Sequence, residues 1–315
     1  MFKSRHILAY AIGLFYFSIA AYSQGDGPRS YLLGPKGVIG ANPKYLNLNQ
    51  NLVPAGNIYL TDSDINVNVF PTTLFYNFGL GGRFAQVQFM FNPANASGTI
   101  VTDQDETITG LNNSGFSDGF MALKLGLIGA PALSIKEFAQ HTPAYSMFGY
   151  LRVWYSGSYD ASKLLNLGTN RFTIEFGTPM SFPLSKNSKR PIWIESYPYI
   201  QLYTKNTDPS IIVQGNEAIQ NPLFGIENHL THNLTEKFWA GIDLRYAIGG
   251  ESEINGQAQD NKINVLGGGI SAGYQILPFL GATSSYGIVL AGDNGLDGNM
   301  FRIGLVFVYA KTEKN

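Results

Sequence analysis

The last strand-like stretch of the chain, residues 301–310, constrains the fold most. It reads FRIGLVFVYA, with Arg302 and Gly304 on one face. The opposite, apolar face repeats at every second residue and consists of Phe301, Ile303, Leu305, Phe307 and Tyr309. So apolar a strand would be an aggregation hazard at the edge of a sheet, and pairing with the first strand of the same chain removes that edge. We therefore expect a closed barrel.

The same strand resembles the closing-strand signal of bacterial outer-membrane β-barrels, which is polar-x-Gly-x-x-apolar-x-aromatic. The matching positions here are Arg302, Gly304, Phe307 and Tyr309. One departure is that Tyr309 is not the last residue. Residues 311–315 follow it, and we expect them to form a short periplasmic tail.

The composition fits a membrane barrel better than a soluble domain. Charged residues make up 14% of the chain and aromatic residues 13%, whereas average soluble domains carry roughly 25% charged residues. The mean hydropathy is close to zero, as expected when lipid-facing and interior-facing residues alternate. The net charge of −1 gives no reason to expect a nucleic-acid partner, and the absence of Cys excludes disulfides and thiolate metal sites.

The N-terminus has the pattern of a secretory signal peptide. Lys3 and Arg5 precede the apolar run 7–21, and small residues then predict cleavage between Ser23 and Gln24. The alternative is an uncleaved anchor, but about fifteen apolar residues are few for spanning a bilayer. After residue 21 no run of eighteen apolar residues occurs, so the sequence predicts no transmembrane helix.

About twelve strand candidates follow, each longer than the typical soluble strand of ~5–6 residues. They lie near residues 38–52, 63–78, 83–92, 117–128, 144–156, 170–183, 191–204, 220–234, 237–249, 262–275, 279–290 and 299–310. The fold class that we predict is all-β, a transmembrane antiparallel up-and-down β-barrel. The even strand number puts both termini in the periplasm.

Alternation sets the face that each side chain should occupy. In a barrel the apolar face points to lipid, so we expect Ile65, Val67 and Val69 to face lipid, and Ile242 likewise. In the alternative, a soluble secreted β-sandwich, the same face would point to a core.

The connections alternate between short and long, as expected for periplasmic turns and extracellular loops. The short links are 79–82, 185–190, 235–236 and 276–278, and the long ones lie near 53–62, 93–116, 157–169, 205–219, 250–261 and 291–298. Residues 129–143 are the exception. There we predict a short periplasmic helix near 131–140, with Pro131 in its first turn.

The charged residues that bear most on function are those predicted to lie on the inner face of the barrel. The residues that we predict to line the lumen are Lys124, Arg152, Arg171, Glu175, Glu195, Glu227, His229, Asp243, Arg245 and Arg302. Five cations and four carboxylates nearly balance. One interpretation is that they form ion pairs that stabilise the barrel, since a dedicated anion pore should show a ring or stripe of one sign.

No catalytic, cofactor or metal site is predicted, and we do not expect an enzyme. His229 and His232 lie three residues apart, which in a strand puts them on opposite faces, and His229 has no evident Ser partner for a phospholipase-type site. Near the C-terminus, Asp293, Asn294, Asp297 and Asn299 supply oxygen ligands of the kind that bind calcium. A simple Gly/Asn/Asp turn is the alternative there.

Four segments resemble the family named for the meta-cleavage pathway of phenol degradation. They are GDGPRSYLLGPKG (25–37) and the segments 114–139, 159–184 and 221–230, in the order expected for the family. Its members are outer-membrane transporters that are sometimes grouped near the long-chain fatty-acid channels. The resemblance implies a β-barrel and makes hydrophobic or aromatic solutes the leading substrate class.

The predicted organisation is a signal peptide (1–23), an N-terminal segment (24–37), a barrel (38–310) and a tail (311–315). We expect the protein to lie in the outer membrane of a Gram-negative bacterium, with the lipid bilayer, the barrel-assembly machinery and a small solute as partners.

A twelve-stranded barrel leaves a narrow passage. The N-terminal segment is predicted to plug it, with Tyr31, Leu32 and Leu33 contacting the solute, or else to be a disordered periplasmic lead. A narrow pore for polar solutes and a structural or surface-binding barrel are the rival functions.

Overall fold

The structure is a computed structural model that describes residues 26–53, 58–59, 62–101, 106–185, 189–294 and 296–310. The predicted signal peptide, the cleavage position between Ser23 and Gln24, and the tail at 311–315 lie outside the described residues. Within the described ranges, no helix is long and apolar enough to cross a membrane.

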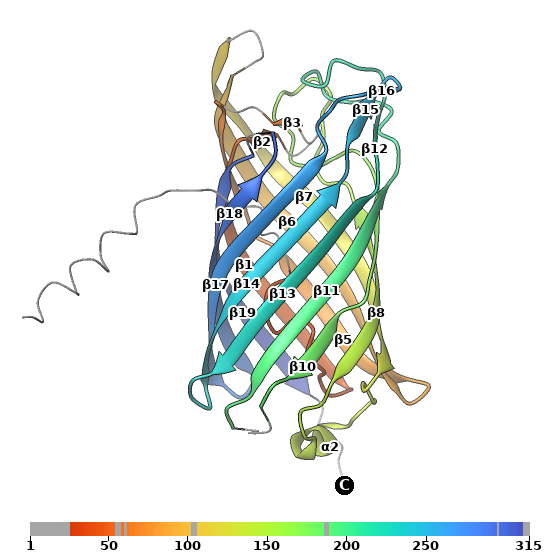
Figure 1. Cartoon of the computed structure of the whole chain (residues 1–315), viewed down its shortest axis with the longest axis vertical. Helices are drawn as coiled ribbons and strands as arrows, with labels where there is room; N and C mark the ends of the chain where they lie inside the picture. Colours follow the sequence, from red (N-terminus) through yellow and green to blue (C-terminus); the bar gives the residue numbers. More distant parts are fainter. Residues whose placement is uncertain are drawn as a thin grey trace, which may run out of the picture.

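One antiparallel sheet curls into a closed barrel (Figure 1). Its segments are β1 (Val38–Gln50), β4 (Asp64–Val69), β5 (Thr72–Leu80), β6 (Arg83–Val101), β7 (Thr107–Ile128), β8 (Ser146–Tyr155), β9 (Thr173–Gly177), β10 (Met180–Pro183), β11 (Ile192–Tyr203), β13 (Leu223–Asn233), β14 (Phe238–Gly249), β17 (Ile263–Leu277), β18 (Leu280–Gly292) and β19 (Gly298–Ala310). They form twelve barrel strands, because β4 and β5 share the neighbours β1 and β6, and β9 and β10 share β8 and β11.

The barrel closes between its first and last strands. β1 and β19 pair antiparallel, from Val38 opposite Ala310 to Gln50 opposite Gly298. Ile303 and Tyr309 face outward with 48% and 68% of their surface exposed, whereas Arg302 is only 8% exposed. The predicted all-β barrel and the closing role of residues 301–310 are therefore confirmed.

The prediction that the apolar side chains of β4 face lipid is wrong. Ile65, Val67 and Val69 are buried on the inner face, while Asn66 and Asn68 point outward. The cause is position along the strand. This part of β4 lies at the end of the barrel where the inner wall is covered by the loop 156–172, so apolar residues there are buried inside rather than in lipid.

An outward row of asparagines continues this reversed pattern over adjacent strands. Its hydrogen-bonded members are Asn47, Asn49, Asn66, Asn68, Asn95 and Asn299. Directly below the row the outer face becomes aromatic, with the rings of Tyr45 and Phe70 5.3 Å apart. On β1 and on β4 and β5 the apolar outer face therefore ends at these two residues.

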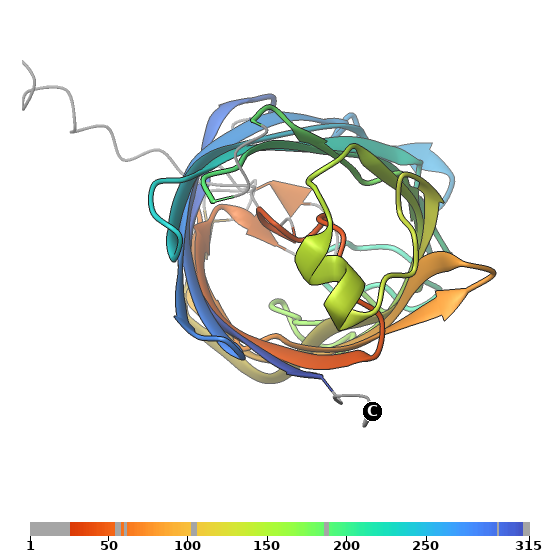
Figure 2. The same cartoon turned by 90° about the horizontal axis from the view of Figure 1, so that it is seen from below.

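A short helix, α2 (Ile135–Gln140), lies near the opposite end of the barrel (Figures 1 and 2). The predicted helix near 131–140 exists, but Pro131 is not in its first turn. Ser134 is the N-cap: its hydroxyl accepts from the Glu137 N–H, and the Glu137 carboxylate accepts from the Ser134 N–H. This capping box fixes the start of the helix, and the second of these bonds lowers the pKa of Glu137.

The other end carries the longer connections, which by the general rule for these barrels is the extracellular side. β6 and β7 extend as a paired hairpin well beyond the rest of the wall (Figure 1). Most of the predicted loop 93–116 is therefore strand. Small additional strands lie among the connections: β2 (Leu52–Val53), β3 (Ile58–Tyr59), β12 (Ala218–Gln220), β15 (Ser252–Ile254) and β16 (Gln257–Ala258).

The two faces of β14 provide a test of this architecture. Ile242 is 58% exposed on the outer face, whereas the neighbouring Asp243 side chain is only 17% exposed. Arg on the lipid face near the bilayer midplane costs ~2–4 kcal/mol. We expect Ile242→Arg to lower the stability of the refolded barrel in lipid vesicles by this amount, measured by urea unfolding.

Asp243→Asn is the matched control, because an amide oxygen can still accept a hydrogen bond from His229. The unheated band on an SDS gel, which migrates differently from the boiled band for a folded barrel, reports whether each variant folds. Equal destabilisation by the two substitutions would contradict the assignment of faces.

Candidate functional site

The polar groups of the barrel interior lie in rows, because antiparallel register places inward-facing residues opposite one another. Three of the rows are Glu195–His229–Asp243, Tyr197–Glu227–Arg245 and Arg152–Glu175–Gln201. Glu175, Glu195, Glu227 and His229 are all buried. The interior thus gathers several charges that need partners.

Residues 26–37, here called the N-terminal segment, lie inside the barrel (Figure 2). They supply some of the hydrogen-bond and ion-pair partners of these interior charges. The backbone N–H groups of Arg29 and Tyr31 donate to the two carboxylate oxygens of Glu195, at 2.7 and 3.0 Å. Arg29 also lies over the ring of Trp239, 4.7 Å from its centroid. The buried Glu195 carboxylate is therefore bound by main-chain donors.

Tyr31 is the central side chain of the segment and is 1% exposed. Its hydroxyl donates to Glu227 at 3.0 Å, and its ring lies 4.9 Å from that of Tyr197. With Phe120 and Tyr150 it belongs to an aromatic cluster in the interior. Tyr31 thus joins the segment to the neighbouring strands β11 and β13.

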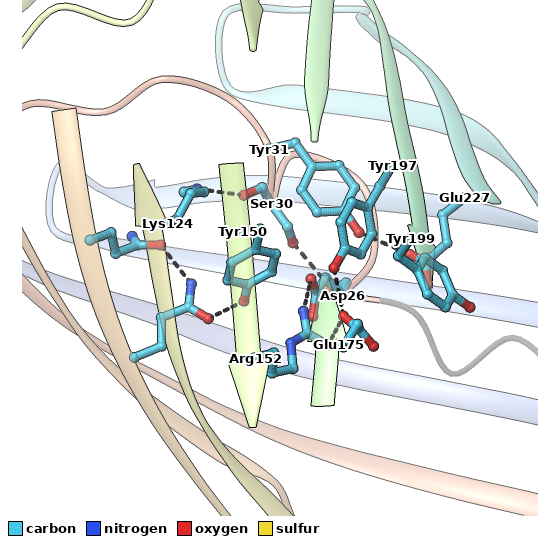
Figure 3. Close-up of polar contacts among 12 residues, drawn as sticks. Asp26, Ser30, Tyr31, Lys124, Tyr150, Arg152, Glu175, Tyr197, Tyr199 and Glu227 are labelled. Atoms are coloured by element: carbon cyan, nitrogen blue, oxygen red, sulfur yellow. Dashed lines mark hydrogen bonds and ion pairs between the residues drawn. The ribbon is translucent and has the colours of Figure 1, made fainter. Parts of the chain in front are cut away.

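Asp26 and Arg152 form the tightest ion pair of the interior, with Nη2 and Oδ2 2.5 Å apart (Figure 3). Arg152 also approaches Glu175 at 3.5 Å, and Glu175 accepts from the Tyr197 hydroxyl at 2.5 Å. The guanidinium carbon lies 4.7 Å from the centroid of the Tyr150 ring. Arg152 is therefore held by two carboxylates and by aromatic faces.

A second group lies on β13 and β14. His229 Nδ1 is 2.6 Å from Asp243, and Arg245 lies 3.5 Å from Glu227 while donating to the Tyr199 hydroxyl at 2.6 Å. Ion pairs of this kind fit a stabilising role for these residues.

Lys124 and Arg171 make other contacts, whereas Arg302 lines a small pocket together with Glu227, His229, Asp243 and Arg245. The ammonium of Lys124 donates to the Ser30 carbonyl at 3.2 Å and lies over the ring of Phe148. Arg302 donates to the Ser285 hydroxyl at 2.9 Å. Arg171 precedes β9 at the extracellular end, where it binds Gln220. The structure therefore does not bring all ten predicted lumen residues into one site.

The N-terminal segment leaves a cavity of about 460 Å³ between itself and the far wall of the barrel. Its aromatic lining consists of Tyr31, Phe75, Phe84, Phe120, Tyr150, Trp239 and Tyr274. Leu32 also lines this cavity, whereas Leu33 packs against Phe84, Ala130 and Phe148 instead.

Several interior charges escaped the sequence analysis, among them Asp26, Arg29 and Lys44. Asp26 and Arg29 lie in a segment with no strand periodicity, so nothing indicated which way they point. The inner face of β1 mixes Gly40, Asn42, Lys44 and Leu46, so its alternation was too weak to set a phase.

The extracellular end of the interior is closed by the loop 156–172. Leu165 and Leu167 pack on the inner wall against Leu48 and Ile65. Asp118 holds the loop in place, accepting from the backbone N–H of Gly157 at 2.9 Å and from the Thr169 hydroxyl at 2.6 Å. The interior is thus obstructed from above by this loop and from below by the N-terminal segment.

The predicted oxygen cluster near the C-terminus does not converge on one point. Asn299 belongs to the outward asparagine row, and Asp293 accepts from the side chain of Asn264 at 2.8 Å. Asn294 has a positive φ of 59°, as in a turn. Among the described residues, no group of three His, Cys, Asp or Glu side chains is arranged to hold a metal ion.

The Asp26–Arg152–Glu175 group generates a stability prediction. Arg152→Gln leaves two buried carboxylates without their cation, which should cost about 3–5 kcal/mol. Asp26→Asn should cost less, because Arg152 keeps Glu175. Urea unfolding in vesicles, followed by tryptophan fluorescence, measures both.

Lys205→Gln is the matched control for the loss of one cation. Lys205 pairs with Glu217 at 2.8 Å, but both side chains are about 40% exposed, so its loss should cost roughly 0–1 kcal/mol. If Arg152→Gln and Lys205→Gln had the same effect, the interior network would not hold the segment.

Comparison with solved structures places the fold among outer-membrane proteins. An outer membrane channel from Pseudomonas putida F1 is 18% identical and superposes with a TM-score of 0.72 over 90% of this chain and 100% of that chain. The transport unit of the autotransporter AIDA-I from Escherichia coli is 12% identical, with a TM-score of 0.52 over 86% and 90%. No curated protein matches this sequence.

The sequence itself matches a family over residues 65–303, which is most of the barrel. The match agrees with the resemblance found from the four segments, and these solved structures, all less than 25% identical, share the barrel fold. The chain belongs to the family described as "Putative MetA-pathway of phenol degradation".

Proposed function

We propose that this protein is a passive channel that takes up small hydrophobic or aromatic molecules across the outer membrane. The observation that carries the proposal is the cavity inside the barrel, whose lining includes seven aromatic side chains beside many polar ones. Its volume of about 460 Å³ lies within the ~300–1,000 Å³ of ligand pockets. An engineered apolar cavity of about 150 Å³ already binds benzene, so one substituted ring fits with room to move.

The residues between the extracellular end and the cavity also support the passage of a small apolar solute. The aliphatic residues under the loop 156–172 offer an apolar surface at the extracellular end, where porin-type barrels are polar. The aromatic cluster around Tyr31 and Tyr197 follows below it. An apolar solute meets compatible surface along this path, and passage requires the loop and the N-terminal segment to move.

We further propose that the N-terminal segment is a plug. Its support is the set of bonds that hold it in the interior, above all the two N–H groups on Glu195 and the Asp26–Arg152 pair. Tyr31 and Leu32 are the residues of the segment that we expect a solute to contact.

A narrow pore for small polar solutes is the second candidate, and one observation favours it. Asn77, Gln86 and Gln88 line the same cavity and form a hydrogen-bonded row, with the two bonds 2.7 and 2.6 Å long. Such a row would suit a hydroxylated solute.

Proteoliposome flux separates these functions. Phenol should enter vesicles that contain the protein severalfold faster than glucuronate, after subtraction of flux through protein-free vesicles. Removal of residues 26–35 should increase the flux of both solutes severalfold, because it opens the interior.

Removal of the exposed residues 257–260 is the control for a shortened chain, and the unheated gel band verifies folding. Unchanged flux after removal of residues 26–35 would exclude the plug. Faster passage of glucuronate than of phenol would exclude the preference for aromatic solutes and favour the polar pore.

A further inference from the structure

The outer face of the wall carries a neutral polar patch above the aromatic residues that end its apolar part. The patch extends the asparagine row onto β7, because Asn95 is opposite Ser114 and Ser97 is opposite Asn112 in the register of β6 and β7. Its members, here called the amide patch, are Asn299 on β19, Asn47 and Asn49 on β1, Asn66 and Asn68 on β4, Asn95 and Ser97 on β6, and Asn112 and Ser114 on β7. None of them is charged.

Hydrogen bonds within the amide patch fix the orientation of its side chains. Asn47 donates to Asn68 at 2.9 Å, and Asn68 donates to Asn95 at 3.1 Å. Toward the other end, Asn49 donates to Asn299 at 3.3 Å. These bonds connect side chains from β19 to β6. A ligand that reaches the patch therefore meets amides that are already oriented.

The two ends of this chain of bonds keep their donors. Asn95 and Asn299 each accept one bond through the amide oxygen, and among the described residues neither side chain donates one. Each of the two amide oxygens also has a second lone pair. The amide patch therefore presents N–H donors and C=O acceptors side by side on the outer surface.

The inner side of this part of the wall is tightly packed. Leu48, Ile65 and Met300 alternate with the asparagines of β1, β4 and β19, and all three are buried in one apolar cluster. Leu165 and Leu167 of the loop 156–172 belong to the same cluster. The patch is thus held from behind by a hydrophobic core. A surface ordered in advance loses little conformational freedom when it binds.

The chemistry of the patch distinguishes among lipid head groups. Phosphates only accept hydrogen bonds and are bound by Arg and Lys, and the patch contains neither residue. Ammonium groups only donate, and the patch offers them no carboxylate. A hydroxyl both donates and accepts, as a side-chain amide does. A neutral head group rich in hydroxyls therefore fits the patch best.

The width and height of the patch fit such a head group on a lipid. Five adjacent strands spaced ~4.8 Å apart make the patch roughly 19 Å wide, which is enough for more than one sugar ring. Directly below it lie exposed rings that suit acyl chains, among them Phe70 at 44% and Phe116 at 52% exposure. A glycolipid whose acyl chains contact these rings places its sugars on the amides.

We propose that the amide patch binds the sugar head group of a glycolipid in the extracellular leaflet of the membrane. The proposal rests on the proposed function only for its location, an outer membrane, whose outer leaflet consists of glycolipid. It gives the patch no part in the passage of solutes. Neutral hydroxyls, rather than lipid phosphates, are the groups that this surface recognises.

Native mass spectrometry of the detergent-solubilised protein measures this binding. Digalactosyl diacylglycerol and phosphatidylglycerol with the same acyl chains are the probes, so that only the head group differs. We expect the digalactosyl lipid to bind about tenfold more tightly than phosphatidylglycerol. The same titration with a purified lipopolysaccharide should show binding that depends on the same side chains.

Asn95→Ala and Asn299→Ala should each weaken binding of the digalactosyl lipid about fivefold, the effect of one net hydrogen bond. Asn95→Gln keeps an amide and should retain most of the affinity. Asn264→Ala is the matched control and should change nothing, because Asn264 is an amide on β17, outside the patch, and is bonded to Tyr246 and Asp293. The unheated gel band verifies that each variant folds.

Equal binding of the two lipids by the unmodified protein would refute the sugar site, and so would equal effects of Asn95→Ala and Asn264→Ala. A concentration-dependent dimer that Asn95→Ala abolishes would also refute it, since a second copy of the chain would then cover the patch. Phenol flux reports separately on the proposed function. If flux is absent while the digalactosyl lipid binds as expected, the channel is refuted and the sugar site stands.

Discussion

The structure depends on the pairing of β1 with β19, because backbone N–H and C=O groups in hydrocarbon have no water to bind. An open edge in the membrane would leave a full row of such groups unsatisfied, each costing several kcal/mol. The register from Val38–Ala310 to Gln50–Gly298 removes that edge and closes the sheet at twelve strands. Twelve strands in turn set an interior that is too wide for wall side chains alone to fill and narrow enough for one segment of chain to divide.

The N-terminal segment and the charged side chains of the wall stabilise each other. Glu195, Glu227 and Arg152 are buried in a space that water reaches poorly, and burial of unpaired charge is costly. The segment supplies two N–H donors, one hydroxyl and one carboxylate to these three side chains. The wall, in return, orders a stretch of chain that has no secondary structure of its own. The shape of the remaining cavity follows from this mutual arrangement.

Much of this could be predicted from alternation, and the exceptions have physical causes. The outer face of residues 301–310 and of Ile242 followed from a period of two, which also put Glu175, Glu195 and Glu227 on the inner face. Periodicity could not locate the partners of these carboxylates, because Asp26, Arg29 and Tyr31 precede the first strand. Periodicity also could not decide whether Ile65 faces lipid or the interior. Alternation separates the side chains of a strand into two faces, but it does not indicate the surroundings of each face. The start of α2 was readable from the Ser134–Glu137 pair, which outweighs the preference of Pro131 for a first turn.

At Phe70 the apolar side of the wall changes from facing outward to facing inward. This change has a consequence for the position of the barrel along the membrane normal. Below Phe70, β5 is built with its apolar side outward, as lipid requires. Above it, β4 has Ile65 and Val67 inside and Asn66 and Asn68 outside, as in a water-soluble protein. A bilayer a few ångströms thicker would draw the asparagine row into hydrocarbon, and a thinner one would leave Phe70 and its neighbours in water. Either mismatch costs free energy, so the same residue pattern that defines the wall also matches the barrel to a membrane of one thickness.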